Sequence, residues 1–583
     1  MKMKQIISLA IALLLVCGMP VSAFAEEYDL ATGSITVTAN EGGQSVTQVN
    51  GVTDYQETTP TVITQTITEA APSTTNTVTI NAAENAEANV TIQDVNIDTS
   101  TSGGAAIQTE GKGDAVIELD GTNTVQSSSG NAGVQKTNGG NLTISDENGT
   151  AGSLKATGGF AGAGIGGGPA ASVPGNNITI TGGTIEAIGG DSGAGIGGGG
   201  GQSADGITIT GGKVTATGKG NAAGIGGGAG GAGSNITISG GDVEATGGDR
   251  GAGIGGGGGG TGSNITITGS AEVTAKGGEN GAGIGGGSGQ SGSSITVSGG
   301  NVEATGGFSA SGIGGGAGGS GEIITITGNA EVTAKGGLSG AGIGGGQEGS
   351  CSNITVSGDA QVKAQGGRAR TYPDFTQYGL GAAIGNGGTK DTDGVEVEPN
   401  TDELTPNGKI EYYAPGADMK TADPIKTVTG TYVPPQDEEK PPVDEEKPPV
   451  DEEKPPVDEE KPDQPSQSAE ESAAEAVYSD PLYRVINQDG EDIPHKAERK
   501  DGVLTVTVDA DFASLTGSLG GINALKEQGI DTIVFITNGA SSAFALSDLL
   551  AQGSTGDSYT LNHNGDAVSF TLSSGADLGN ILK

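Results

Sequence analysis

The sequence is 583 residues long and contains 114 glycines, no tryptophan and only 3% aromatic residues. So few large side chains argue against one conventional hydrophobic core of that length. The formal net charge is −43, and a negative field of this size excludes nucleic acid and anionic membranes as partners.

Residues 1–25 are predicted to be a secretory signal peptide. Two lysines precede an apolar run over residues 6–16, and an Ala-x-Ala cleavage pattern follows at residues 23–25. The run is shorter than the ~20 residues of a membrane helix, and no later run reaches that length, so we expect no membrane insertion. Cys17 leaves a lipoprotein as the alternative. The mature chain is therefore expected outside the cell, either secreted or associated with the cell surface.

Residues 101–390 form a repeat of about 30 residues, and residues 26–100 are expected to be an N-terminal cap with irregular first coils. Two apolar positions keep this period. The first is occupied by Leu154, Ile185, Val214, Val243, Val273, Val302, Val332 and Val362. The second is occupied by Ile107, Val134, Ile165, Ile196, Ile225, Ile254, Ile284, Ile313, Ile343 and Ile384, which makes ten ranks.

Each unit contains three short segments in which apolar and polar residues alternate, for example residues 178–181, 185–187 and 163–165. A period of two predicts β-strands, and Gly, Asn and Asp between them predict turns. One unit cannot bury its apolar face alone, whereas stacked units can. The sequence therefore predicts a mainly β protein with a parallel β-helix of three strands per coil. We expect it to be right-handed, because parallel crossovers almost always are.

The outward positions of the repeat support the same stacking. Along the second strand, Glu alternates with Thr, so that like charges never lie on adjacent coils, where they would repel. This column reads Glu186, Thr215, Glu244, Thr274, Glu303, Thr333 and Lys363. The first strand carries an outward array of Thr and Ser that resembles the ice-binding face of some antifreeze β-helices. Threonine is also a common strand residue, so ice binding stays an alternative.

An insertion at residues 368–378 is the most site-like segment of the coil, because it stretches one repeat step to 41 residues, from Ile343 to Ile384. Aromatic rings that stack on sugars, with Arg and Asp to bind hydroxyls, are what carbohydrate recognition requires. A flap that covers the end of the stack is the structural alternative. The candidate carbohydrate-binding residues are Arg368, Arg370, Tyr372, Asp374, Phe375, Gln377 and Tyr378.

Three segments follow the repeat. Residues 391–432 are expected to be the C-terminal cap of the helix, with strands at 410–413 and 426–428. Residues 433–477 contain a seven-residue PPVDEEK repeat, and proline with charge predicts an extended, solvated linker. Residues 478–583 are predicted to be a small α/β domain, with one helix face marked by Leu515, Leu519, Ile522 and Leu525. Its histidines, His495 and His563, are expected at the surface or in turns.

The sequence contains few motifs that indicate a catalytic, metal or cofactor site. The G-x-G-x-x-G match at residues 162–167 lacks the helix that a dinucleotide site needs. Asp does not recur in register in the repeat, so no calcium ladder is predicted. We expect no cofactor, and bound calcium is the alternative. Glycan hydrolysis needs paired carboxylates, and lyase chemistry needs clustered acids beside a base. We find neither pattern, no catalytic residue and no metal ligand, so a polysaccharide lyase or hydrolase is only an alternative.

The pattern NITITGG, VEATGG and GAGIGGG resembles repeats of glycine-rich right-handed β-helix surface proteins of Firmicutes, some of them described as carbohydrate-binding domain-containing. The resemblance covers about residues 100–390 and implies the β-helix fold and a carbohydrate ligand. A related family that binds acidic plant polysaccharide carries Gly-Asp-Asp-Gly-Ile-like motifs, and these are missing here.

The sequence as a whole favours a secreted or surface-associated, non-enzymatic β-helix for carbohydrate binding or adhesion. Its expected partner is a polysaccharide or a host or cell-surface glycan. A cell-wall or protein partner is expected through the C-terminal domain. The alternatives are a passive structural stalk, a protein-binding surface protein and the glycan-cleaving enzyme named above.

Overall fold

The computed structural model describes residues 27–49, 52–56, 61–69, 71–169, 175–371, 377–431, 483–486, 493, 495–500, 502–510, 512–527, 530–552, 558–564, 567–572 and 578–582. The chain divides into two compact units, Met1–Pro442 and Val443–Lys583, and each is described by itself. The predicted signal peptide and the predicted linker over 433–477 lie outside the described residues. Within the described ranges, no helix is long and apolar enough to cross a membrane.

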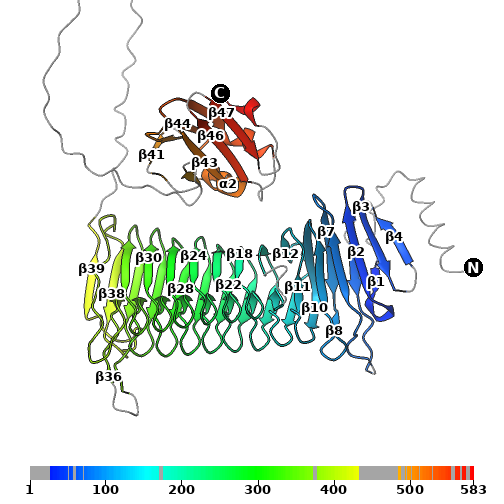
Figure 1. Cartoon of the computed structure of the whole chain (residues 1–583), viewed down its shortest axis with the longest axis horizontal. Helices are drawn as coiled ribbons and strands as arrows, with labels where there is room; N and C mark the ends of the chain where they lie inside the picture. Colours follow the sequence, from blue (N-terminus) through cyan, green and yellow to red (C-terminus); the bar gives the residue numbers. More distant parts are fainter. Residues whose placement is uncertain are drawn as a thin grey trace, which may run out of the picture. The chain divides into compact units, whose positions relative to one another are not determined.

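The first unit is a parallel β-helix, and most of its coils contribute one strand to each of three faces (Figure 1). The predicted fold class is thereby confirmed. The first face, here called the Thr face, points Ile inward and Thr outward; Thr179, Thr208 and Thr237 are register partners on successive coils. Its strands are β1 (Glu27–Asp29), β5 (Thr61–Thr64), β7 (Glu87–Gln93), β10 (Asp114–Gln126), β12 (Leu142–Ser145), β15 (Ile178–Ile180), β18 (Ala204–Ile209), β21 (Gly233–Ile238), β24 (Gly262–Ile267), β27 (Gly292–Val297), β30 (Gly321–Ile326) and β33 (Cys351–Val356).

The second face, the Glu face, buries Val and Ala and exposes the alternating Glu and Thr column. The register pairs Glu186 with Thr215 and Thr215 with Glu244, and the alternation continues coil by coil to Lys363 as predicted. Its strands are β8 (Asn96–Asp98), the second half of β10, β13 (Gly152–Thr157), β16 (Thr184–Ile188), β19 (Lys213–Thr217), β22 (Asp242–Thr246), β25 (Glu272–Lys276), β28 (Asn301–Thr305), β31 (Glu331–Lys335), β34 (Gln361–Gln365) and β38 (Lys409–Tyr413).

The third face, the Gly face, consists mainly of two-residue Ile-Gly strands. All ten predicted ranks from Ile107 to Ile384 are register partners. The column continues beyond the predicted boundary at residue 101, because Val78 pairs with Ile107 and Ile35 with Val78. Its strands are β2 (Ile35–Asn40), β6 (Val78–Ala82), β9 (Ile107–Gly111), β11 (Val134–Lys136), β14 (Ile165–Gly166), β17 (Ile196–Gly197), β20 (Ile225–Gly226), β23 (Ile254–Gly255), β26 (Ile284–Gly285), β29 (Ile313–Gly314), β32 (Ile343–Gly344) and β37 (Ile384–Gly385).

The two ends of the β-helix depart from parallel stacking. At the N-terminal end, β3 (Gly43–Gln48) and β4 (Val52–Gln56) add to β2 as an antiparallel meander after the short helix η1 (Leu30–Thr32). At the C-terminal end, β38 stacks on β34, and β39 (Lys426–Thr429) pairs with β38 in the antiparallel direction. The strands predicted at 410–413 and 426–428 are therefore present.

The second unit packs two four-stranded sheets with two helices. The first sheet has the order β40 (Arg484–Ile486), β43 (Phe512–Ser518), β46 (Ser558–Asn564) and β47 (Ala567–Leu572). The second has the order β41 (Lys496–Lys500), β42 (Val503–Thr507), β44 (Thr532–Ile536) and β45 (Ser541–Ala545). The remaining elements are α2 (Leu519–Glu527), α3 (Leu546–Leu550) and η2 (Gly579–Ile581). The α/β composition predicted for this domain is present.

Two details of the second unit differ from the sequence-based expectation. Leu515 belongs to β43, where it pairs with Leu561, and not to the helix, because the strand runs on to Ser518 and the apolar spacing spans the junction. His563 is completely buried and is not a surface residue. Its ring nitrogens lie 3.1 Å from Thr537 Oγ1 and 2.9 Å from Ser542 Oγ. The hydroxyls satisfy both nitrogens, which makes burial of a neutral imidazole acceptable. His495 is also buried, with 8% exposed.

One coil of the Thr face holds a strained residue. Before each inward Ile, one residue adopts a left-handed backbone: Asn235, Asn264 and Asn353 have φ near +50°, and Ile323 has φ +54° at the same position. Asn tolerates this region, whereas a β-branched side chain does not. Ile323 gains no burial in return, since 52% of it is exposed.

We therefore predict that Ile323→Asn stabilises the β-helix by about 1 kcal/mol, because it relieves the left-handed strain. Thermal unfolding of the full chain measures this. Ile324→Asn is the matched control, since Ile324 points inward and is completely buried, and it should lower the unfolding temperature strongly. An Ile323→Asn variant that melts at or below the parent temperature contradicts the prediction.

A lysine is buried inside the coil at β11. Lys136 is 1% exposed, and its ammonium donates to the backbone oxygen of Asn138 at 2.8 Å. Burial lowers the pKa of Lys136 to about 8, and nearby Asp114 only partly opposes this shift. Below pH 8 the charged Lys136 therefore lowers the free energy of unfolding, because the buried ammonium has lost its hydration.

We predict that Lys136→Met raises the stability at pH 7, since Met fills the same space without charge. Between pH 8 and 10.5, Lys136 of the parent chain is protonated in the unfolded state and neutral in the folded state. The free energy of unfolding therefore rises with pH across this window. The Met variant should lack this contribution. Chemical denaturation across pH measures both effects, with Lys112→Met as control, because the Lys112 side chain is 74% exposed. A parent-like pH slope in the Met variant contradicts the assignment.

Candidate functional site

The predicted insertion forms a short antiparallel hairpin of β35 (Arg370–Thr371) and β36 (Gln377–Tyr378). It places Arg370 opposite Tyr378 and Thr371 opposite Gln377. Three predicted site residues, Tyr372, Asp374 and Phe375, lie outside the described residues. Arg368 is not on the hairpin: it belongs to the turn of the coil, where its Nη2 donates to the Gly416 backbone oxygen at 3.2 Å. The structure thus divides the predicted set between the hairpin and the coil.

Arg370 joins the hairpin to a turn of an earlier coil. Its guanidinium carbon lies 4.1 Å from the centre of the Phe308 ring, and Nη1 donates to Ser309 Oγ at 2.9 Å. A cation over an aromatic face is attractive, and the second bond fixes the direction of the arginine. Phe308 nevertheless keeps 46% of its surface exposed, so a held but accessible aromatic side chain lies beside the predicted insertion.

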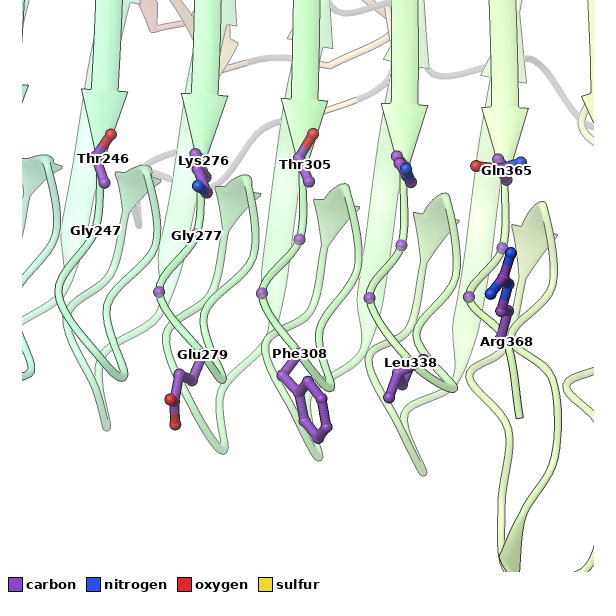
Figure 2. Close-up of a pocket in the computed structure, with 18 of the residues that line it drawn as sticks. Thr246, Gly247, Lys276, Gly277, Glu279, Thr305, Phe308, Leu338, Gln365 and Arg368 are labelled. Carbon is purple, nitrogen blue, oxygen red and sulfur yellow. The ribbon is translucent and has the colours of Figure 1, made fainter. Parts of the chain in front are cut away.

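Phe308 belongs to a groove that runs along the coil axis across five successive turns, here called the turn groove (Figure 2). It begins where each strand of the Glu face ends and has a volume of about 680 Å³. This falls in the ~300–1,000 Å³ range of ligand sites. The strand-side wall consists of Thr246, Lys276, Thr305, Lys335 and Gln365. The turn-side wall consists of Asp249, Glu279, Phe308, Leu338 and Arg368.

Glycine pairs form the floor of the turn groove between these walls. The reason lies in the stacking of the coils: a Cβ on Gly307 would come 1.5 Å from the Gly278 backbone oxygen, and a Cβ on Gly337 would come 1.7 Å from that of Gly307. No side chain fits at these positions. The close backbone contact therefore leaves a trough on the outside of the rod.

The charge of the turn groove differs from that of the chain. Lys276, Lys335 and Arg368 against Asp249 and Glu279 give a formal charge of +1, in a chain of −43. Among the described residues, neither lysine ammonium forms a salt bridge. Two cationic donors, two coils apart, are thus available to a ligand in this trough.

A smaller hollow of about 300 Å³ lies at the hairpin itself. It brings together three predicted residues, Arg370, Gln377 and Tyr378, with Asp391 and Asp393. Asp393 accepts a hydrogen bond from the Leu380 backbone at 2.7 Å. The pairing of acidic and basic groups here suits binding of hydroxyls. The two aspartates escaped the sequence analysis, because they follow the insertion rather than belonging to it.

Most turn-groove residues also escaped the sequence analysis. One feature of the sequence could have indicated them, because the residue after each glycine pair varies from coil to coil. Phe308 and Leu338 are apolar at a position where Asp249 and Glu279 are acidic. In the part of the chain that the structure describes, no three His, Cys, Asp or Glu side chains come together as a metal site.

Six consecutive segments of the chain match the family model described as Beta helix repeat, over residues 178–200, 207–229, 236–258, 265–288, 295–317 and 324–347. No curated protein and no solved structure matches the chain. Each matched segment runs from an Ile of the Thr face to the turn after the Gly face, and four of them supply walls of the turn groove. Four of the five coils that carry the turn groove are therefore right-handed parallel β-helix repeats.

Proposed function

We propose that the chain is a secreted or surface-associated, non-enzymatic protein that binds a glycan in its turn groove. One observation carries the proposal: Phe308 is 46% exposed in a coil almost free of aromatic residues, and Arg370 holds its ring at 4.1 Å. An exposed, fixed ring supplies the apolar face on which sugar rings stack. A ring with no ligand would gain more from burial.

The donors of the turn groove support the same ligand class. Lys276 and Lys335 lie on alternate coils, because both are register partners of Thr305 on the coil between them. Figure 2 shows Lys276 and Thr305 on adjacent coils of the strand-side wall. Ammonium and hydroxyl groups bind the hydroxyls or carboxylates of sugars. Successive coils lie about 4.8 Å apart, so the walls repeat at an interval close to the length of one sugar in an extended chain. A periodic wall suits a periodic ligand.

The hairpin residues extend this proposal. Arg370 contacts Phe308 directly, and Gln377 and Tyr378 lie beside it in the smaller hollow with Asp391 and Asp393. We assign this hollow to side branches or to a second segment of the same glycan. The C-terminal domain is proposed to attach to a cell-wall or protein partner, since a long charged linker separates it from the coil in the sequence.

A glycan-cleaving enzyme is the second candidate, and one observation favours it. Asp249 and Glu279 both line the turn groove on neighbouring coils, and paired carboxylates are the groups that hydrolyse glycosidic bonds. The binding assay below therefore measures sugar release as well.

We predict that Phe308→Ala weakens glycan binding about tenfold, since stacking on an aromatic ring contributes about 1.4 kcal/mol. The measurement is retention of the mature chain on a panel of soluble and insoluble polysaccharides and oligosaccharides, with and without EDTA. Phe160→Ala is the matched control: Phe160 also follows a glycine pair and is 61% exposed, but it lies outside the turn groove. It should bind as the parent chain does.

Each other outcome has a definite meaning. Equal retention of the Phe308→Ala and Phe160→Ala variants overturns the turn groove as the site. Released sugar, lost on Glu279→Gln, establishes the enzyme instead. Retention that disappears in EDTA assigns a role to calcium. No retention on any glycan overturns carbohydrate binding and favours the stalk.

A further inference from the structure

The turn groove has a defined beginning, because its glycine floor is interrupted. Thr217 and Thr246 are register partners, so Gly218 and Lys219 occupy the place of the first floor pair, Gly247 and Gly248. Lys219 is exposed and therefore projects where the following coils carry only hydrogen. The floor then continues through five coils.

The turn groove also has a defined end. Strand β38 adds one more coil, with Tyr413 opposite Gln365. Ala414 and Pro415 follow it in place of a glycine pair, so this coil carries side-chain carbons where the five preceding coils carry only hydrogen. Gly416 of the same segment lines the turn groove together with Arg368. Residues 414–417 are here called the end wall.

Two side chains of the last groove coil fix the end wall. Gln365 Nε2 donates to the backbone oxygens of Ala414 at 2.7 Å and Ala417 at 2.8 Å. Arg368 Nη2 donates to that of Gly416 at 3.2 Å. Three hydrogen bonds thus hold the wall against the coil, and it is a built feature rather than a loose loop.

The end of the turn groove contains an unsatisfied acceptor. Gln365 is completely buried, yet its Oε1 has no hydrogen-bond partner among the residues that the structure describes. Figure 2 shows this oxygen on the side of the preceding coil, which is the side of the groove. A buried acceptor without a partner costs about 1–3 kcal/mol, and a donor delivered by a ligand would remove this cost. The unpaired Lys335 lies on the preceding coil of the same wall.

We propose that the turn groove is a closed-ended site that binds the end of a glycan chain, with the terminal sugar against Gln365, Arg368 and the end wall. This rests on the proposed function and adds to it a ligand of limited length. Five coils at about 4.8 Å span roughly 19 Å from first to last, which accommodates about four or five sugars. The chain end, and not the middle of a polymer, is the recognised unit.

The test uses the full mature chain with two ladders of probes, cello-oligosaccharides and galacturonic acid oligosaccharides of two to eight units. Affinity should rise with length and stop rising at about four or five units. Each oligosaccharide is also prepared with a bulky tag on its reducing end or on its non-reducing end. One tag should lower the affinity at least tenfold, because that end faces the wall, and the other should leave it unchanged.

Two variants locate the boundaries. Ala414→Gly combined with Pro415→Gly opens the end wall, so the tag that lowers the affinity of the parent chain should no longer do so. Lys219→Gly extends the glycine floor by one coil, so the plateau should move to longer probes. Thermal unfolding of each variant shows that the coil is intact. Pro406→Gly is the control for loss of a proline, because Pro406 is not among the residues that line the turn groove.

The proposal is overturned by affinity that keeps rising to eight units, or by equal tolerance of both tags. Retention on intact polysaccharides without binding of either ladder overturns the closed end while leaving the proposed function in place. Absence of binding to every polysaccharide and both ladders overturns the two together.

Discussion

Contact between the backbones of successive coils is the constraint on which the molecule depends. Parallel strands fix the spacing at about 4.8 Å, and the turns between the faces must keep that spacing where no strand guides them. They do so with glycine, because a Cβ on Gly307 would lie 1.5 Å from the oxygen of the coil below. The inward Ile and Val columns then pack into one continuous hydrophobic cluster. Their burial stabilises the rod, which compensates for the entropy lost when so many glycines are ordered.

The candidate site is a by-product of the same constraint. Glycine pairs that allow coils to touch also leave a trough on the outer surface. The residues on its two sides do not belong to the inward hydrophobic columns. These positions vary along the rod, from Asp249 and Glu279 to Phe308, Leu338 and Arg368, whereas the inward columns stay almost constant. Chemistry can therefore change from coil to coil without any cost to the fold, and the insertion after β34 adds Arg370 to the same place.

The fold could be predicted closely from the sequence, since period and alternation are properties of one coil repeated many times. The Ile column and the Glu–Thr alternation were both placed in the correct register. The first coils were harder to recognise, because Ile35 and Val78 lie in strands rich in Val and Thr without the glycine signature. The turn groove was not predicted. Its walls come from residues about 30 positions apart, and only the stacked structure shows that Lys276, Phe308 and Lys335 share one trough.

The alternation on the Glu face has a consequence for how such a rod is able to grow. Glu186, Glu244 and Glu303 are separated by Thr-bearing coils, so the chemically complete module is a pair of coils. Duplication of a Glu-bearing coil or loss of a Thr-bearing coil would place two carboxylates on adjacent coils, whereas gain or loss of a pair preserves the pattern. A change of length by two coils is therefore the one that keeps every carboxylate of this column next to a threonine.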